Sequence, residues 1–117
     1  MKTYDQIEGW FNDDEVTAYK FLIDSTQNRG VFVECGAWLG RSSSFLCDYA
    51  NDRIKIFIVD TWKGSSNELN SFHRLAAITD IYPIFLENMG TRKFTPIRKE
   101  SIEASSNLLT IAAMLYS

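Results

Sequence analysis

Two short segments of the sequence hold residues whose types and spacing could bind a ligand. The first, residues 34–40, reads ECGAWLG and follows a short apolar run. Its Gly36 can adopt backbone angles that other residues avoid, and it lets a ligand approach the main chain closely. The second segment ends at Asp60, whose carboxylate could accept hydrogen bonds from the two vicinal hydroxyls of a ribose. A glycine loop and a carboxylate of this kind predict a nucleotide-type ligand held between them.

Further polar groups accompany these two segments. A helix that begins near Arg41 would offer free backbone N–H groups and a partial positive charge to a carboxylate or phosphate. Ser42 and Ser43 stand at that helix start. Glu100 and Ser101 follow the last strand that the sequence predicts, where polar groups could contact the edge of an adenine.

The spacing of residues excludes several familiar sites. The glycines follow the pattern E-x-G-x-x-x-G, not the G-x-G-x-x-G of dinucleotide-binding loops, and no G-x-x-x-x-G-K-[ST] phosphate loop occurs. Ser44 stands where a G-x-S-x-G nucleophile elbow needs glycine, and His73 is the one histidine, so a serine triad is not expected. Cys35 and Cys47 lack C-x-x-C spacing, which predicts reduced thiols in a cytoplasmic protein and no metal site.

The composition is typical of one soluble domain. The chain has 117 residues, 45% of them hydrophobic and 23% charged, with a net charge of −3. Its apolar runs are far shorter than the about 20 residues that a membrane helix needs, and its first residues lack the apolar core of a secretory signal. A mildly acidic chain is also a poor partner for phosphate backbones. We therefore expect neither a nucleic acid nor a membrane as a partner.

Hydrophobic periodicity predicts alternating helices and strands. A helix over 13–27 comes first, capped by Asn12 or Asp13. Apolar runs at 31–33 and 54–59 predict strands, the first of them buried on both faces as in parallel sheets. A third strand is expected over 94–98, where Pro96 disfavours a central position in the sheet. The helices expected after the strands cover residues 41–50, 69–80, 84–89 and 102–115.

This order of elements predicts a single α/β domain over residues 1–117. Parallel strands joined by right-handed crossovers form a Rossmann-like sheet with flanking helices, here a partial one of about three to four strands. Residues 1–29 would form an N-terminal helical arm and residues 30–117 a βαβαβα core. Ligands of such sheets bind outside the carboxyl ends of the strands, where the glycine loop and Asp60 would meet.

Four segments resemble the motifs of one protein family in their order and spacing. Residues 33–43 (VECGAWLGRSS) resemble the first motif of class I S-adenosylmethionine-dependent methyltransferases, in the branch that acts on small molecules, sugars or lipids. Residues 58–64 (IVDTWKG) resemble the second motif of that branch, and 85–89 (FLENM) its F-x-x-N signature. Residues 96–101 (PIRKES) resemble its adenine-side segment, which more commonly reads Gly-Asp-Ser or Gly-Asp-Ala. The resemblance covers nearly the whole chain.

The resemblance implies S-adenosylmethionine, or its product S-adenosylhomocysteine, as the cofactor. Glu34, Gly36 and Gly40 would line the methionine part, and a serine at the helix start could bind its carboxylate. Asp60 would hold the ribose hydroxyls, and Trp62 would flank the adenine. The full set of implied cofactor-binding residues is Glu34, Gly36, Trp38, Gly40, Ser42, Ser43, Asp60, Trp62, Glu100 and Ser101.

Other interpretations of some of these residues stay open. Trp38 and Trp62 could be core or rim aromatics. Glu34 could be a strand-end carboxylate satisfied by nearby backbone N–H groups. Three aromatic residues near the start of the chain either shield a substrate pocket or dock the N-terminal arm, and docking is favoured: Tyr4, Trp10 and Phe11.

A complete domain of this family has more strands than this chain offers, and the residues that act there as base or metal ligands have no counterpart over 108–116. We therefore expect either a methyltransferase-like protein or a non-catalytic module for cofactor binding or assembly. The first would transfer a methyl group to a small-molecule or sugar acceptor, with its catalytic residues unassigned. A nicotinamide-binding fragment is a third alternative. One side of the first strand would stay open in such a shortened sheet, which predicts a homo-oligomer.

Overall fold

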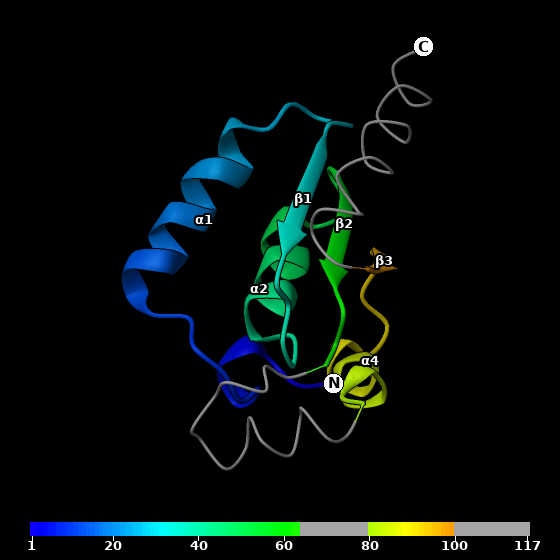
Figure 1. Cartoon of the computed structure of the whole chain (residues 1–117). Coiled ribbons are helices and arrows are strands. Elements are labelled where there is room, and N and C mark those ends of the chain that lie inside the picture. The colour runs from blue at the N-terminus through cyan, green and yellow to red at the C-terminus, as the bar shows by residue number, and fades with distance from the viewer. Residues whose placement is uncertain (64–79, 100–117) are drawn as a thin grey trace.

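A three-stranded parallel sheet organises residues 1–63 and 80–99, the part of the chain that the computed structural model describes (Figure 1). Its strands are β1 (Val31–Cys35), β2 (Lys55–Asp60) and β3 (Thr95–Arg98), in the order β1-β2-β3. Both neighbouring pairs of strands are parallel. Because helices alternate with these strands along the chain, the predicted α/β class and Rossmann-like arrangement are confirmed.

The described helices are α1 (Asp13–Ser25), α2 (Arg41–Ala50) and α4 (Tyr82–Met89), preceded by a short 3-10 turn, η1 (Tyr4–Gln6). Helix α2 covers the predicted residues. Helix α4 begins two residues before the predicted start because Pro83 fits the first turn of a helix, where its missing N–H is not needed. The helices expected over 69–80 and 102–115 lie outside the described residues, apart from Asp80. None of the described helices is long and apolar enough to cross a membrane.

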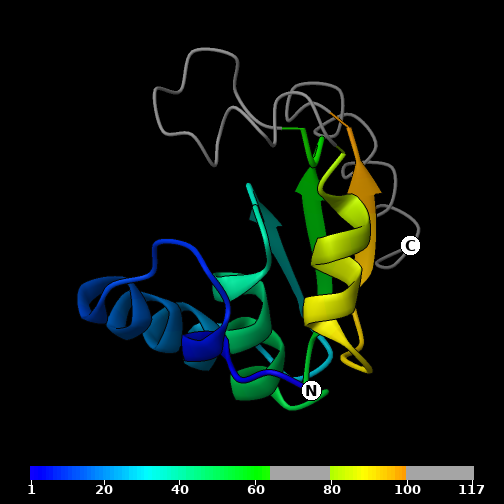
Figure 2. The ribbon, with the colours of Figure 1, turned by 90° about the horizontal axis from the view of Figure 1, so that it is seen from below.

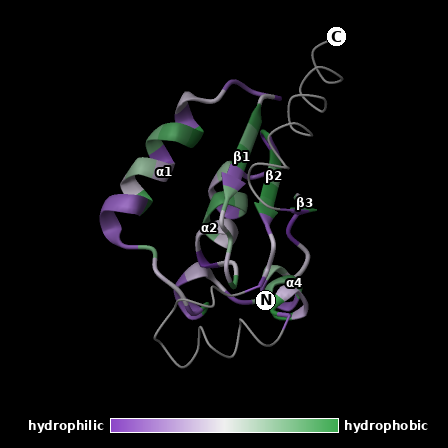
Figure 3. Ribbon diagram, in the orientation of Figure 1, coloured by the Kyte–Doolittle hydropathy of each residue, from purple (hydrophilic) through white to green (hydrophobic). Residues whose placement is uncertain are grey.

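The core lies between the sheet and the helices α2 and α4, which occupy the same side of it (Figure 2). Ile56 and Ile58 of β2 are buried there, and Leu46 of α2 and Phe85 of α4 pack in the same cluster. Figure 3 shows hydrophobic residues concentrated on β1 and β2, whereas α1 mixes hydrophobic and polar positions. The sheet and the helices α2 and α4 therefore form the rigid frame on which the loops at the strand ends are mounted.

Strand β1 is not buried on both faces, so that prediction is wrong. The Val33 side chain is 38% exposed, and Val31 is half-buried. In the described sheet β1 pairs only with β2, whereas β2 lies between two partners and keeps Ile56 to Val59 buried. A short run of apolar residues has the same hydrophobic pattern at an edge and at the centre of a sheet. The pattern therefore does not show whether a strand pairs with one other strand or with two. Pro96 lies in β3, at the other edge of the described sheet, as predicted.

The N-terminal cap of α1 gives a direct test of what stabilises this helix. Asn12 Oδ1 accepts a hydrogen bond from the backbone N–H of Glu15 at 2.9 Å. We expect Asn12→Ala to lower the free energy of unfolding by about 1 kcal/mol, because one N–H of the first turn loses its partner. Urea denaturation measures the change, and Asn12→Asp, which keeps an acceptor at the cap, serves as the control. Equal losses in both variants would show that the loss does not come from the missing acceptor and would contradict the expectation.

Candidate functional site

The loop that follows β1 leaves the main chain open at Gly36. This residue has a φ of +86°, and its N–H donates to the carbonyl oxygen of Val59 at 2.8 Å. Gly36 is exposed, and a β-carbon built at it would meet no atom of residues 1–63 and 80–99 within 4 Å. The backbone at the carboxyl end of β1 therefore faces open space, the approach that the sequence predicts for a ligand.

Asp60, at the end of β2, holds this loop through its carboxylate. Oδ2 accepts hydrogen bonds from the backbone N–H groups of Ala37 at 2.7 Å and Trp38 at 3.0 Å. Oδ1 accepts one from the N–H of Trp62 at 2.9 Å. The structure thus brings together the glycine loop and the carboxylate that the sequence singles out. A carboxylate has about four lone-pair sites, and among the described residues Oδ1 accepts this one bond, which leaves a lone pair for a ligand hydroxyl. Whether a ribose binds there stays a prediction.

Trp38 adopts an uncommon backbone conformation within this loop. Its φ is +53°, in a turn closed by a hydrogen bond from the Gly40 N–H to the Ala37 carbonyl at 2.9 Å. Bulky residues seldom adopt positive φ, and the bond from the Trp38 N–H to Asp60 helps to hold this one there. Its ring is half-buried, with the Trp10 ring centroid 6.5 Å away.

Gly40 faces the core. It has a φ of +102° and caps the N-terminus of α2. A β-carbon at this position would lie 3.2 Å from both Met89 Sδ and Phe85 Cδ2 of α4. Glycine is required here for the positive φ and for the close approach of α4, and the predicted contact with a cofactor stays untested.

Glu34 is buried at the end of β1 and bonded by two hydroxyl groups. Tyr19 Oη of α1 donates to Oε2 at 2.6 Å, and Ser43 Oγ of α2 donates to Oε1. These partners are side-chain hydroxyls and not the backbone N–H groups of the alternative interpretation. Burial raises the pKa of the Glu34 carboxyl, and the two hydroxyl bonds only partly oppose this. Ser42, half-buried, stands beside this group at the start of α2.

Trp62 is fully buried. Its ring centroid lies 4.6 Å from that of Tyr82 and 4.8 Å from that of Phe85. Of the two interpretations of this residue, the core one describes its position in the structure. Glu100 and Ser101 lie outside the described residues.

Asn88 supports the glycine loop, a role that the sequence analysis does not assign. Its Nδ2 donates to the carbonyl oxygen of Leu39 at 3.0 Å, and the side chain is buried. Phe85, three residues earlier, packs against the position of Gly40. Residues three apart lie on the same face of a helix. The spacing of Phe85 and Asn88 could therefore have predicted that both side chains contact the same element.

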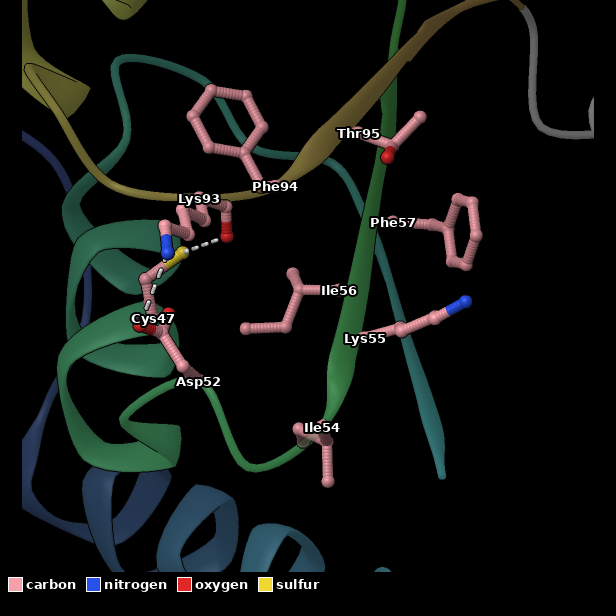
Figure 4. A pocket seen from close by; sticks show the side chains of 9 residues that line it. All are labelled: Cys47, Asp52, Ile54, Lys55, Ile56, Phe57, Lys93, Phe94 and Thr95. Atoms are coloured by element: carbon pink, nitrogen blue, oxygen red, sulfur yellow. Dashed lines mark hydrogen bonds and ion pairs between the residues drawn. The ribbon is translucent and has the colours of Figure 1, made fainter. Parts of the chain in front are cut away.

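A cavity of about 500 Å³ lies away from these residues, where β2 and β3 begin (Figure 4). Lys55 and Thr95, the first residues of the two strands, line it, and Lys93 forms an ion pair with Asp52 at 3.7 Å on its rim. Cys47 also lines it and donates its thiol to the Lys93 carbonyl; burial raises the pKa of this thiol to about 12. None of the predicted ligand-binding residues that the structure describes borders this cavity.

Comparisons with known proteins do not place the chain in a family. No known protein family matches it, and no curated protein matches it either. Among residues 1–63 and 80–99, no group of three or more His, Cys, Asp or Glu side chains could hold a metal ion.

The buried Glu34 gives this site a pH dependence. Its pKa is raised above the ordinary value of 4.5, so the folded protein binds the proton more tightly than the unfolded chain does. Stability conferred by the protonated form is complete below about pH 4.5 and is lost as the pH rises through the folded-state pKa. We expect Glu34→Gln to remove this loss, so that its free energy of unfolding relative to the wild type increases from pH 4.5 to pH 8.

Urea denaturation at several pH values measures the effect, and Glu87→Gln, on the exposed side of α4, is the control. A constant difference in stability between Glu34→Gln and the wild type across this range would contradict the expectation.

Proposed function

We propose that this chain binds S-adenosylmethionine, or S-adenosylhomocysteine, at the carboxyl ends of β1 and β2. One observation carries the proposal. The Asp60 carboxylate lies within hydrogen-bond distance of the loop in which Gly36 faces open space. An extended ligand with a hydroxylated sugar in its middle and a charged group at one end fits between a carboxylate and an open main chain at this edge of a parallel sheet.

In this proposal the two ends of the site have different tasks. The methionine part lies over Gly36, and the N-terminus of α2, near Ser42 and Ser43, attracts its carboxylate. Asp60 Oδ1 accepts a hydrogen bond from the ribose with its remaining lone pair. The buried Glu34 lies beneath the start of the loop and holds α1 and α2 together through Tyr19 and Ser43.

The proposed reaction is methyl transfer to a hydroxyl of a small-molecule or sugar acceptor. The bond between the sulfonium sulfur and its methyl carbon breaks with its electron pair remaining on sulfur, while a new bond forms between that carbon and the acceptor oxygen. The acceptor hydroxyl releases its proton to water, and the cofactor leaves as the neutral thioether S-adenosylhomocysteine. The main contribution of the protein to such a step is to align the two reactants. The proposal assigns no residue as the base.

Calorimetric titration with S-adenosylhomocysteine tests the proposal. We expect binding at micromolar concentration to the wild type and a loss of at least tenfold in Gly36→Asn, on the order expected for a blocked approach to the main chain. Asparagine tolerates positive φ better than other side chains, so this variant fills the open space with little strain. Asp60→Ala should also lose affinity for S-adenosylhomocysteine, partly because it removes the hydrogen bonds that hold the glycine loop.

Asp24→Ala is the matched control, because this exposed carboxylate accepts a bond from Tyr49 near the C-terminal end of α2, whereas the site lies at the start of that helix. Thermal unfolding shows whether each variant is folded. The proposal is overturned if the wild type does not bind S-adenosylhomocysteine, or if Gly36→Asn binds it as tightly as the wild type. Binding of NAD in its place would favour the nicotinamide alternative.

A second proposed function, assembly, rests on the outer edge of β1. The N–H of Lys55 donates to the carbonyl of Gly30, and the N–H of Gly36 donates to Val59. Backbone groups of a strand alternate in direction, so those of Val31 and Val33 point away from β2. This edge has neither the proline nor the bulge that natural edge strands use against pairing.

We propose a second copy of the chain as the partner at this edge. An antiparallel pair with Val33 opposite Val33 of the second copy satisfies the outward groups of both strands and keeps two-fold symmetry. We expect sedimentation velocity at micromolar concentration to show a dimer for the wild type and a monomer for Val33→Pro. The proline removes an outward N–H and leaves the bonds between β1 and β2 intact.

Val33→Thr keeps the N–H and a similar size, so it should still dimerise. Val33→Lys, a charged edge residue, is a second disrupting variant in case the proline unfolds the strand. A wild type that sediments as a single monomeric species at this concentration would contradict the assembly proposal.

A further inference from the structure

Strand β2 extends beyond its neighbour β3 at the amino end of the sheet. β2 begins at Lys55, whereas β3 begins at Thr95, which lies opposite Phe57. Just before β3, the carbonyl oxygen of Lys93 accepts a weak hydrogen bond from the Cys47 thiol of α2, with 3.9 Å between sulfur and oxygen. The chain at Lys93 is thus attached to α2, and the cavity of about 500 Å³ in Figure 4 opens where a longer β3 would lie beside β2.

Two backbone groups at the start of β2 face this cavity. The N–H of Lys55 donates to the carbonyl oxygen of Gly30 at 2.8 Å, toward β1. The carbonyl of Ile54 belongs to the same trans peptide and points the opposite way. The N–H of Ile56 points to that side too, because backbone groups alternate in direction along a strand. Ile54 and Ile56 line the cavity, and within the described residues no hydrogen bond joins either group to another part of the chain.

The cavity has an apolar wall on the side of α2. Figure 4 shows the side chains of Ile56, Phe94 and Cys47 on that side of β2, whereas Lys55 and Phe57 point the other way. Ile56 and Cys47 belong to the buried core, and Phe94 packs against it. Burial raises the pKa of the Cys47 thiol to about 12, so this group stays neutral at physiological pH. The wall is therefore suited to an apolar group of a ligand.

Two opposite charges lie at the rim of the cavity. Lys93 Nζ is 3.7 Å from Asp52 Oδ2, and the two side chains are 81% and 65% exposed. An ion pair as exposed as this one adds little to stability, so each partner exchanges it for a ligand charge at small cost. Asp52 follows the C-terminus of α2, where the helix dipole also favours a positive charge. The rim thus offers one position for a cation and one for an anion.

We propose that this cavity binds an apolar α-amino acid in its zwitterionic form. The ammonium group of the amino acid donates to the Ile54 carbonyl oxygen and to the Asp52 carboxylate. Its carboxylate accepts from the Ile56 N–H and from Lys93, and its side chain packs on the apolar wall. The inference is independent of the proposed function, because the cavity lies at the amino ends of β2 and β3 and the glycine loop at the carboxyl end of β1.

Titration with L-leucine, followed by NMR of the backbone amide signals, tests the inference. We expect the Ile56 signal to shift saturably, with a dissociation constant in the millimolar range for a ligand of this size. N-acetyl-leucine, which lacks the ammonium group, and leucinamide, which lacks the carboxylate, should each bind on the order of tenfold more weakly. Glycine, which has no apolar side chain, should also bind more weakly than leucine.

The two rim residues allow a charge-matched test, because both are exposed and their substitution leaves the core intact. Lys93→Gln should weaken leucine binding on the order of threefold and should not weaken leucinamide binding, since leucinamide has no carboxylate for Lys93. Asp52→Asn should weaken leucine binding by a similar factor and should not weaken the binding of N-acetyl-leucine. Lys99→Gln, at an exposed lysine beyond the carboxyl end of β3, is the control for a change of charge alone.

The absence of a saturable shift of the Ile56 signal with leucine overturns the inference. Equal binding of leucine and its two blocked derivatives overturns it as well, and so does an equal loss for leucine and leucinamide in Lys93→Gln. Leucine that shifts the signals of the glycine loop in place of Ile56 would bind at the other end of the sheet, which also overturns the inference.

Discussion

The three hydrogen bonds accepted by the Asp60 carboxylate hold the ends of β1 and β2 in one arrangement. Two of the donors belong to the glycine loop and the third to Trp62, so one charged side chain fixes the turn after each strand. A neutral apolar residue in its place would leave three backbone N–H groups without partners, which is costly where the groups are part-buried. The positive φ of Trp38 and the open main chain at Gly36 both depend on this one anchor.

The fold follows from the sequence to the extent that local patterns determine it. Helix α2 was predictable because serines at its start and Asn51 at its end mark both limits, and β2 because a long apolar run ends at a charged residue. The exposure of Val33 was not predictable, since it depends on which strands are neighbours. The burial of Trp62 depends in the same way on Phe85 of α4, which the chain reaches only after more than twenty residues.

The residues of the candidate site also fall into those that local sequence predicts and those that depend on long-range packing. Gly36 and Asp60 were found from residue type and position, because glycine flexibility and a strand-end carboxylate are local properties. The partners of Glu34 were not predictable in this way, since Tyr19 lies fifteen residues earlier on helix α1 and meets the carboxylate of this strand residue only after α1 has packed. The role of Asn88 was also missed, because its hydrogen bond to Leu39 joins elements 49 residues apart. Residue types locate the loop, and long-range packing determines what supports it.

The attachment of the glycine loop to α4 would couple the binding of a molecule at the loop to the stability of that helix. Asn88 and Phe85 contact the loop at Leu39 and Gly40, so the loop and the helix share one local unfolding equilibrium. A molecule that rigidifies the loop also disfavours the opening of α4, and by thermodynamic linkage any change that loosens α4 weakens that molecule's affinity. Substitutions on α4 would therefore change how tightly a molecule at the glycine loop is bound, even without contacting it.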